Sequence, residues 1–176
     1  MIVKKATQLG NPVIRARAKS VKPATKATKK IVTDLTDSMR HFGLVGMAAP
    51  QIGKSARVFV TEIRKTKYRK KEQKDKLRVF LNPRIKSFSQ KLAKKWEGCG
   101  SVASANLFGM TKRPASLVVT AQDQRGEKFE LEAKGLLAQV IQHEMDHLNG
   151  KVFTDLADPK SYMSKSEYLK MNGRRR

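Results

Sequence analysis

The chain has a single cysteine, Cys99, among its 176 residues. An intrachain disulfide is therefore impossible, and a reducing compartment is the natural environment for such a chain. It also lacks any apolar run long enough to cross a membrane. No apolar stretch follows the N-terminus, so we expect neither a secretory signal nor membrane attachment. Aromatic residues make up only 6%, but 39% hydrophobic and 30% charged residues are typical of one globular domain.

Acidic residues are also scarce. The chain holds 15 Asp and Glu against 38 Lys and Arg, a formal net charge of +23. This charge predicts attraction to polyanions, RNA above all, although a lysine-rich surface that merely stays solvated has the same composition. The densest basic run, residues 64–76, is typical of a solvated loop and has only Tyr68 for stacking on a base.

Histidine is rare as well, and two of the three histidines stand together in the pattern His143-Glu-Met-Asp-His147. On a helix these two lie one turn apart on the same face, so both imidazoles can bind a single metal ion. Glu144 is then placed to accept a proton from the water that such an ion activates. No proline interrupts residues 135–148, and Asn149-Gly150 is a helix stop signal. Apolar residues recur at helical spacing: Leu136, Leu137, Val140, Ile141, Met145 and Leu148.

A third metal ligand has two candidates. Cys99 lies between Gly98 and Gly100, and a thiolate with two histidines is a known catalytic set with an open fourth position. An inert buried thiol is the alternative. Glu167 lies at the distance from His147 that a thermolysin-like protease would need, whereas Phe153 occupies the position of the third histidine of a metzincin.

Other stretches carry weaker signals. The segment 44–53 is rich in small residues, which let a ligand approach the backbone, and Gln51 is its one side chain with directed hydrogen bonds. The pattern predicts a helix at 26–42, strands at 57–63, 77–83 (ending at Pro83), 85–88 and 92–97, a turn and short extended segment at 9–15, and a short helix at 161–170.

Three ordered segments resemble the peptide deformylase family. That family carries Gly-x-Gly-x-Ala-Ala-x-Gln, then Glu-Gly-Cys-x-Ser, then His-Glu-x-x-His, and here they read Leu44–Gln51, Glu97–Ser101 and His143–His147. The likeness spans about residues 2–156 and includes Gly10–Arg15 near the start. Two residues depart from it: Leu44 replaces the first glycine, and Gly100 stands where many members have leucine.

The resemblance implies an α+β fold in which antiparallel strands pack around a central helix bearing the two histidines. Residues 1–158 would form the catalytic domain, with the basic insert at 64–76. Residues 159–176 would form a basic tail containing a short helix. The resemblance also implies an ion pair between Glu97 and Arg113.

The resemblance implies removal of the N-formyl group from formylmethionine of nascent chains, with release of formate. One divalent ion would be bound by Cys99, His143 and His147; Fe²⁺ is expected in the cell, although Zn²⁺, Ni²⁺ or Co²⁺ can fill such a site. Glu144 would be the general base, and the Gln51 side chain and Gly100 N–H would stabilise the oxyanion. The backbone of Val45, Gly46 and Gly98 would align the peptide, and Val140 would line the methionine pocket.

The expected partners are formylmethionyl nascent peptides and, through the basic insert and tail, the ribosome or its RNA. We expect a monomer in the cytoplasm, or in an organelle if the source is eukaryotic. Two other functions stay open from the sequence. One is an HExxH metalloprotease that uses Glu167 as its third ligand, and the other is a basic RNA-binding protein with a degenerate metal site.

Overall fold

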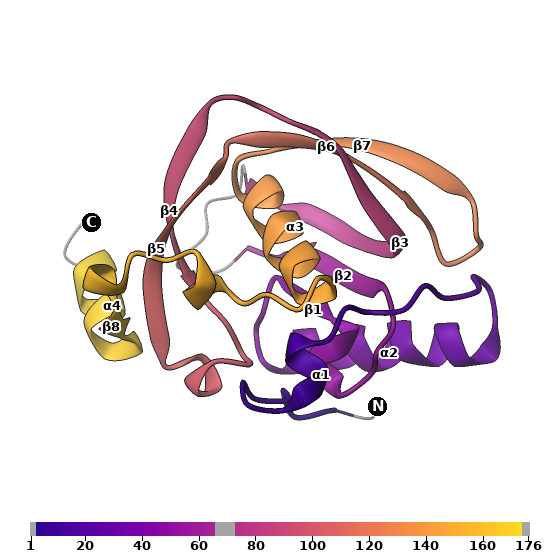
Figure 1. Cartoon of the computed structure of the whole chain (residues 1–176), viewed down its shortest axis with the longest axis horizontal. Helices are drawn as coiled ribbons and strands as arrows, with labels where there is room; N and C mark the ends of the chain where they lie inside the picture. Colours follow the sequence, from indigo (N-terminus) through magenta and orange to yellow (C-terminus); the bar gives the residue numbers. More distant parts are fainter. Residues whose placement is uncertain (1–2, 66–72, 174–176) are drawn as a thin grey trace.

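The computed structural model describes residues 3–65 and 73–173, so residues 66–72 of the predicted basic insert and the last three residues lie outside it. The described chain has an α+β fold with two antiparallel sheets and a central helix, α3 (Gly135–Leu148), as the sequence predicts (Figure 1). No helix among residues 3–65 and 73–173 is both long and apolar enough to span a bilayer.

The larger sheet has the strand order β1-β2-β3-β6-β7, and the smaller has the order β4-β5-β8. The strands are β1 (Gly46–Ala48), β2 (Val58–Ile63), β3 (Asp75–Phe88), β4 (Leu92–Gly98), β5 (Leu107–Pro114), β6 (Ser116–Gln122), β7 (Lys128–Lys134) and β8 (Met163–Ser164). Both β1 and β4 are edge strands, so each has one side that is not paired within its sheet.

The other helices are α1 (Pro12–Arg15), α2 (Lys26–His41) and α4 (Lys165–Gly173), with short 3-10 turns at Ala49–Ile52, Ala103–Ala105, Phe153–Asp155 and Pro159–Ser161. Helix α2 confirms the prediction for residues 26–42. The Thr25 side chain caps it by accepting a hydrogen bond from the Thr28 N–H, and Gly43, just past its end, has φ +66°, which glycine adopts at little cost.

Strand β2 separates two hydrophobic cores. Because successive side chains of a strand point to opposite faces, Phe59 packs with Ile141 of α3, whereas Val58 and Val60 pack with Leu35 of α2. The two helices therefore cover opposite faces of the larger sheet, and α3 packs against β1, β2, β6 and β7.

Two local predictions were wrong. Strand β3 continues through Pro83 because an irregularity in the register between Leu81 and Arg84 lets the ladder omit the proline. Asn82, at φ 50°, stabilises this bulge by bonding both the N–H and the carbonyl of Val21. Residues 12–15 are helical rather than extended, because the Asn11 side chain caps a turn that begins at Pro12.

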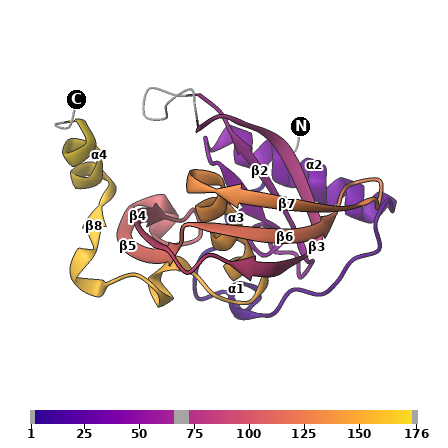
Figure 2. The same ribbon diagram turned by 90° about the horizontal axis from the view of Figure 1, so that it is seen from above.

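The C-terminal segment docks on the smaller sheet. Strand β8 pairs with residues 107–108 of β5, and the Tyr168 ring of α4 stacks on Phe108 with ring centroids 4.1 Å apart. The predicted tail helix is present but begins only at Lys165. Figures 1 and 2 both place α4 at one end of the molecule, apart from α3.

Candidate metal centre and active site

Helix α3 presents two histidines and a glutamate at the interface between the sheets. His143 and His147 lie one turn apart with ring centroids 4.9 Å from each other. His147 is fully buried, and Glu144 is 3% exposed. The apolar face of α3 therefore carries polar groups into a region where water cannot satisfy them, which requires a specific partner.

Cys99 supplies that partner from the turn that follows β4. Its Sγ lies 3.2 Å from His147 Nε2, and no two ligand atoms of Cys99, His143 and His147 are more than 4.8 Å apart. Bonds of about 2.0–2.3 Å to a shared ion place its ligand atoms roughly 3–4 Å from one another. The structure thus brings together the three residues that the sequence nominates as ligands.

The surroundings of the Cys99 sulfur favour a thiolate. Burial alone would raise the pKa of this thiol, but the charge of His147 and hydrogen bonds from both histidines lower it well below its ordinary value. The Ser101 N–H also points at the sulfur, at 3.4 Å. A buried anionic sulfur beside two imidazoles is the donor set that a divalent cation binds, and a cation would supply the positive charge that the thiolate needs.

Glu144 lies beside this triad with its carboxylate poorly satisfied. Its Oε2 is buried and has no hydrogen-bond partner among residues 3–65 and 73–173. Burial raises the pKa of Glu144 to about 7. Such a carboxyl group can both accept and return a proton near neutral pH.

Gln51, in the 3-10 turn Ala49–Ile52, also reaches the sulfur. Its Oε1 accepts a hydrogen bond from the Ala48 N–H at 2.8 Å, which turns the amide nitrogen toward Cys99 Sγ at 3.6 Å and Ser101 Oγ at 3.5 Å. The side chain is 2% exposed. A buried amide donor therefore points at the centre of the site.

A cavity of about 150 Å³ opens onto these residues. Its lining is mainly apolar, with Gln51, His143 and Glu144 among its polar groups. The residues that line it are Leu44, Val45, Gly46, Gln51, Trp96, Glu97, Gly100, Leu136, Gln139, Val140, His143 and Glu144. A pocket with this character is what a small organic substrate needs in order to be bound and oriented.

Comparisons with known proteins identify the family. A family model described as polypeptide deformylase matches residues 3–162. Peptide deformylase 1 of Ralstonia nicotianae is 38% identical over 153 residues, which cover 86% of this chain and 85% of that protein. The chain belongs to the peptide deformylase family.

Solved structures agree with this assignment. The peptide deformylase of Thermotoga maritima superposes with a TM-score of 0.79 at 33% identity, covering 90% of this chain and 100% of that one. The Met-Ala-Ser-bound class I type b peptide deformylase of Acinetobacter baumannii gives a TM-score of 0.83 at 27% identity, covering 88% and 98%. This chain is accordingly a metallohydrolase of the deformylase family, in which Cys99, His143 and His147 form the site for one divalent metal ion.

The rival third ligand is wrong. Glu167 lies on α4, its side chain is 58% exposed, and it pairs with Lys170 at 2.7 Å. It does not belong to the group of ligand atoms around His143 and His147. The protease alternative therefore loses its third ligand, and a complete triad also argues against a degenerate metal site in an RNA-binding protein.

Two glycines of the deformylase motifs are explained by packing. A Cβ on Gly46 would overlap the Glu144 carboxylate and Val140, so only glycine lets β1 approach α3 this closely. A Cβ on Gly98 would lie 2.8 Å from the Phe108 ring. Gly98 does not line the cavity, so its role in binding substrate stays a prediction.

Glu97 connects the site to a buried ionic network. The predicted pair with Arg113 is confirmed, with a second hydrogen bond from Arg113 to Glu97 at 3.0 Å. Glu97 also accepts from Thr111 at 2.7 Å and contacts His143 Nδ1 at 2.9 Å, while Arg113 bonds Asp146 at 2.8 Å. The sequence does not predict the contacts of this network to His143, Thr111 and Asp146. These contacts join residues 14 to 46 positions apart, and some of the side chains belong to no motif.

Proposed function

We propose that this deformylase hydrolyses the N-formyl amide of formylmethionyl peptides, giving formate and a free N-terminus. The observation that carries the proposal is the mainly apolar cavity lined in part by Glu144, Gln51 and His143, next to the ligand atoms of Cys99 and His147. When bound, the divalent ion supplies Lewis acidity, which lowers the pKa of a water molecule and polarises the formyl carbonyl. The remaining steps are carried by groups of the chain itself.

Glu144 moves the proton. Its unpartnered Oε2 accepts a proton from the attacking water as the oxygen bonds to the formyl carbon. The same carboxyl then donates this proton to the peptide nitrogen as the carbon–nitrogen bond breaks. A pKa of about 7 suits both transfers, because neither protonation state is strongly favoured near neutrality.

Gln51 Nε2 and the Gly100 N–H stabilise the negative charge on the formyl oxygen. The Gln51 amide is held by Ala48 and points into the site. Gly100 lines the same cavity, and its N–H makes no backbone hydrogen bond to a described residue. Removing one such donor commonly costs about a hundredfold or more in rate.

The peptide binds between two sheet edges. Strand β1 ends one sheet and β4 ends the other, and Val45 and Gly46 at the start of β1 line the cavity. An extended peptide can add to such an edge through main-chain hydrogen bonds, with Gly98 at the end of β4 on the other side. Val140 and Leu136 supply apolar surface for the methionine side chain. The Acinetobacter baumannii relative binds Met-Ala-Ser, which supports a substrate of this kind.

We further propose Fe²⁺ as the ion in the cell, because thiolate and imidazole ligands suit it, with Zn²⁺, Ni²⁺ or Co²⁺ as substitutes. Metal analysis of anaerobically purified protein tests this, and a preparation that holds only zinc would overturn it. We also propose that the protein is a monomer. Its single cysteine, a free thiol, suits a reducing compartment, which is the cytoplasm or an organelle of a eukaryote.

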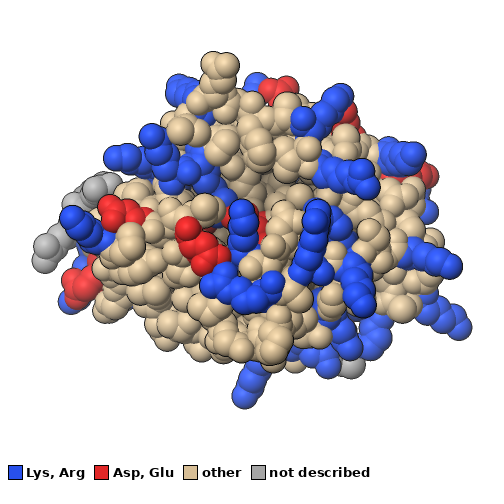
Figure 3. All heavy atoms as spheres, viewed as in Figure 1, with Lys and Arg blue, Asp and Glu red and all other residues tan. Residues whose placement is uncertain are grey.

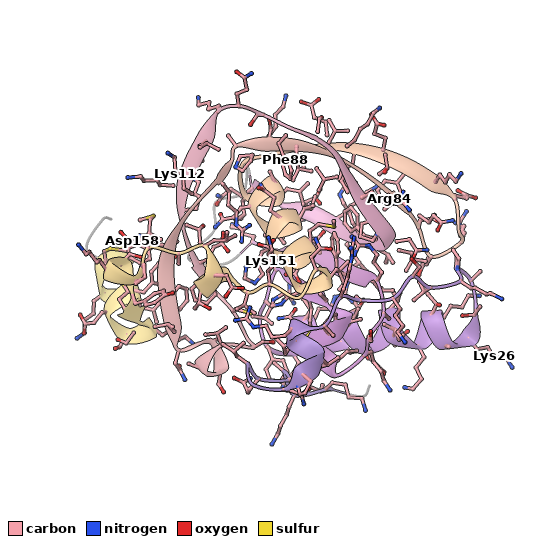
Figure 4. The ribbon with its side chains drawn as sticks, in the orientation of Figure 1. Lys26, Arg84, Phe88, Lys112, Lys151 and Asp158 are labelled. Carbon is pink, nitrogen blue, oxygen red and sulfur yellow. The ribbon has the colours of Figure 1, made fainter. Side chains whose placement is uncertain are left out.

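The positive surface supports a second partner, the ribosome. Lys and Arg side chains spread over the face shown in Figure 3 with few acidic groups among them. Lys26, Arg84 and Lys112 extend to solvent from three different elements (Figure 4), so the charge is not confined to the insert and tail.

We propose that the tail 159–176 and the insert 64–76 bind ribosomal RNA beside the catalytic domain 1–158. In a pelleting assay, binding should weaken steeply with salt and on truncation after Asp158; absent or salt-insensitive binding would refute this partner.

The reaction itself is tested by formate release from formyl-Met-Ala-Ser. Anaerobically purified, Fe²⁺-loaded protein should turn over, and Glu144→Gln, with the same metal content, should not. Turnover by both proteins would exclude Glu144 as the base. No turnover by the loaded wild type would overturn the proposed substrate.

A further inference from the structure

The Gln8 side chain links the N-terminal segment to the loop that carries Gly100. Its Nε2 donates to the Gly100 carbonyl at 2.9 Å and to the Ala6 carbonyl at 2.9 Å. Its Oε1 accepts from the Ser104 N–H at 3.0 Å. One half-buried amide thus makes three hydrogen bonds that join residues up to 96 positions apart.

The backbone beside Gln8 strengthens this link. The Thr7 N–H donates to the Gln51 carbonyl at 2.7 Å, and the Leu9 N–H donates to the Ser101 carbonyl at 2.7 Å. Residues 7–9 therefore bridge the two segments that carry the proposed oxyanion donors, Gln51 and Gly100. Neither of these two segments would by itself set the distance between Gln51 and Gly100.

Gly100 needs such an anchor more than another residue would. Glycine has the greatest backbone freedom of any residue, and the Gly100 N–H has no backbone acceptor among the described residues. The N–H and carbonyl of Gly100 belong to two successive peptide planes joined at its Cα. The first plane is held from within the loop, where the Val102 N–H donates to the Cys99 carbonyl at 3.1 Å, and the second is held by the hydrogen bond from Gln8.

The segment after Gly100 is strained, and Gln8 contacts it too. Ala103, Ser104 and Ala105 have φ of 47°, 52° and 64°, a left-handed conformation that non-glycine residues adopt rarely. Strained backbone persists only where its surroundings hold it. The bond from the Ser104 N–H to Gln8 is one such restraint, so the same side chain holds both ends of this loop.

We propose that Gln8 is a positioning residue that orients the Gly100 N–H toward the developing oxyanion. The proposal rests on the proposed function for the meaning of that N–H, but the anchoring itself can be measured without turnover. Glutamine suits the task because its planar amide can donate twice and accept: one donor and the acceptor bind the loop, and the other donor binds Ala6.

A substitution at Gly100 provides a rescue. Gly100 does not lie in the left-handed region, and an added Cβ would meet Ala6 and Leu44 only at ordinary contact distances of 3.5 and 3.6 Å. Gly100→Ala therefore fits and restricts the backbone without Gln8. If Gln8 acts by restricting the Gly100 backbone, Gly100→Ala should recover part of the kcat that is lost when Gln8 is replaced.

The experiment compares Gln8→Met, which keeps the length of the side chain but removes all three hydrogen bonds, with Gln124→Met on the exposed turn between β6 and β7. With formyl-Met-Ala-Ser and Fe²⁺-loaded protein, Gln8→Met should lower kcat about tenfold to a hundredfold, because small misplacements of catalytic groups cost this much. KM should change less than about twofold. Gln124→Met should match the wild type. Gly100→Ala should restore most of the lost kcat in the Gln8→Met background.

Amide hydrogen exchange of zinc-loaded protein supplies the readout that does not depend on turnover. Gln8→Met should speed exchange at Ser104, which loses its acceptor, and at Val102, whose N–H bonds the Cys99 carbonyl in the same peptide plane as the Gly100 N–H. The absorption of the cobalt-substituted protein shows that Cys99 still binds metal. Unchanged exchange at Val102 would overturn the proposal, and so would a rise in KM at constant kcat or a failure of Gly100→Ala to restore kcat. A wild type without turnover would instead overturn the proposed function, and the exchange result would still decide whether Gln8 holds the loop.

Discussion

His143 Nδ1 lies 2.9 Å from Glu97 Oε2, so the imidazole turns its other nitrogen, Nε2, toward Cys99 and His147. Burial alone would raise the pKa of Glu97, but hydrogen bonds from His143 and Arg113 and their charges hold it far below its usual value. Glu97 therefore stays ionised. An ionised carboxylate behind a metal-binding histidine fixes the ring and makes it a stronger ligand.

Glu97→Gln should weaken metal binding about tenfold to a hundredfold, which is the usual effect of losing such a partner. The substitution keeps the shape of the side chain but removes the charge that orients His143. Competition with a chelator for Zn²⁺ measures the change. Glu132→Gln, on an exposed side chain of β7 that pairs with Lys134, is the matched control and should leave affinity unaltered. Equal affinity in all three proteins would mean that α3 alone orients His143.

Tyr168→Ala should lower the free energy of unfolding by about 1–2 kcal/mol, since the stacked ring on Phe108 is a principal contact of α4 with the smaller sheet. Tyr168→Phe keeps the ring and should retain nearly all of the stability. Chemical denaturation of the three proteins measures the difference. If Tyr168→Ala were as stable as the wild type, the ring stack would not contribute to the docking of α4, and the pairing of β8 with β5 would account for it.

Glu62→Gln should remove a pH-dependent contribution to stability. A hydrogen bond from Arg40, followed by the charges of Arg40 and Arg64, lowers the pKa of Glu62 below its ordinary value. A carboxylate with a lowered pKa in the folded state stabilises the protein above its unfolded pKa and loses this effect as the pH falls. At pH 7 the variant should be about 0.5–1 kcal/mol less stable, because Arg40 is 45% exposed and the pair is partly screened.

Thermal unfolding from pH 7 down to pH 3 tests the Glu62 prediction. The difference between wild type and Glu62→Gln should shrink as the pH falls below about 4.5, the range in which the unfolded-state carboxyl protonates. Glu127, which is exposed before β7, forms no ion pair with another residue in the described ranges, so Glu127→Gln is the control. A difference that stayed constant over this range would show that the pair contributes through packing.

The elements that the sequence predicted well are those whose burial is periodic. Helices α2 and α3 each bury one stripe against the sheet, so the spacing of Leu35 and Met39, or of Ile141 and Leu148, carries the signal. The sequence pattern predicts no strand in residues 101–134, although β5, β6 and β7 lie there. The sequence predicts a strand end at Pro83. This prediction was wrong because the strand continues through a bulge that depends on Asn82 and on Val21, which is distant in the chain.

The candidate site likewise divides into residues that the sequence predicts and contacts that it does not. His143, Glu144 and His147 follow from spacing within one helix, and Cys99 follows from its glycine neighbours and from resemblance. Glu97 as the partner of His143, and Gln8 as the partner of Gly100, join residues 46 and 92 positions apart. Such contacts exist only after the sheets have packed, so local pattern cannot reveal them.

Gly46→Ala should abolish most turnover while leaving a folded protein, because the added Cβ falls where the Glu144 carboxylate and Val140 lie. Either β1 must move away from α3 or the base must leave its position, and a shift of about 1 Å in a catalytic group can cost a hundredfold. Gln124→Ala, on the exposed turn between β6 and β7, is the control and should match the wild type. Formate release, with metal content and circular dichroism of each variant, separates loss of catalysis from loss of fold. Full activity of Gly46→Ala would show that Glu144 has room to move and is not held where the cavity ends.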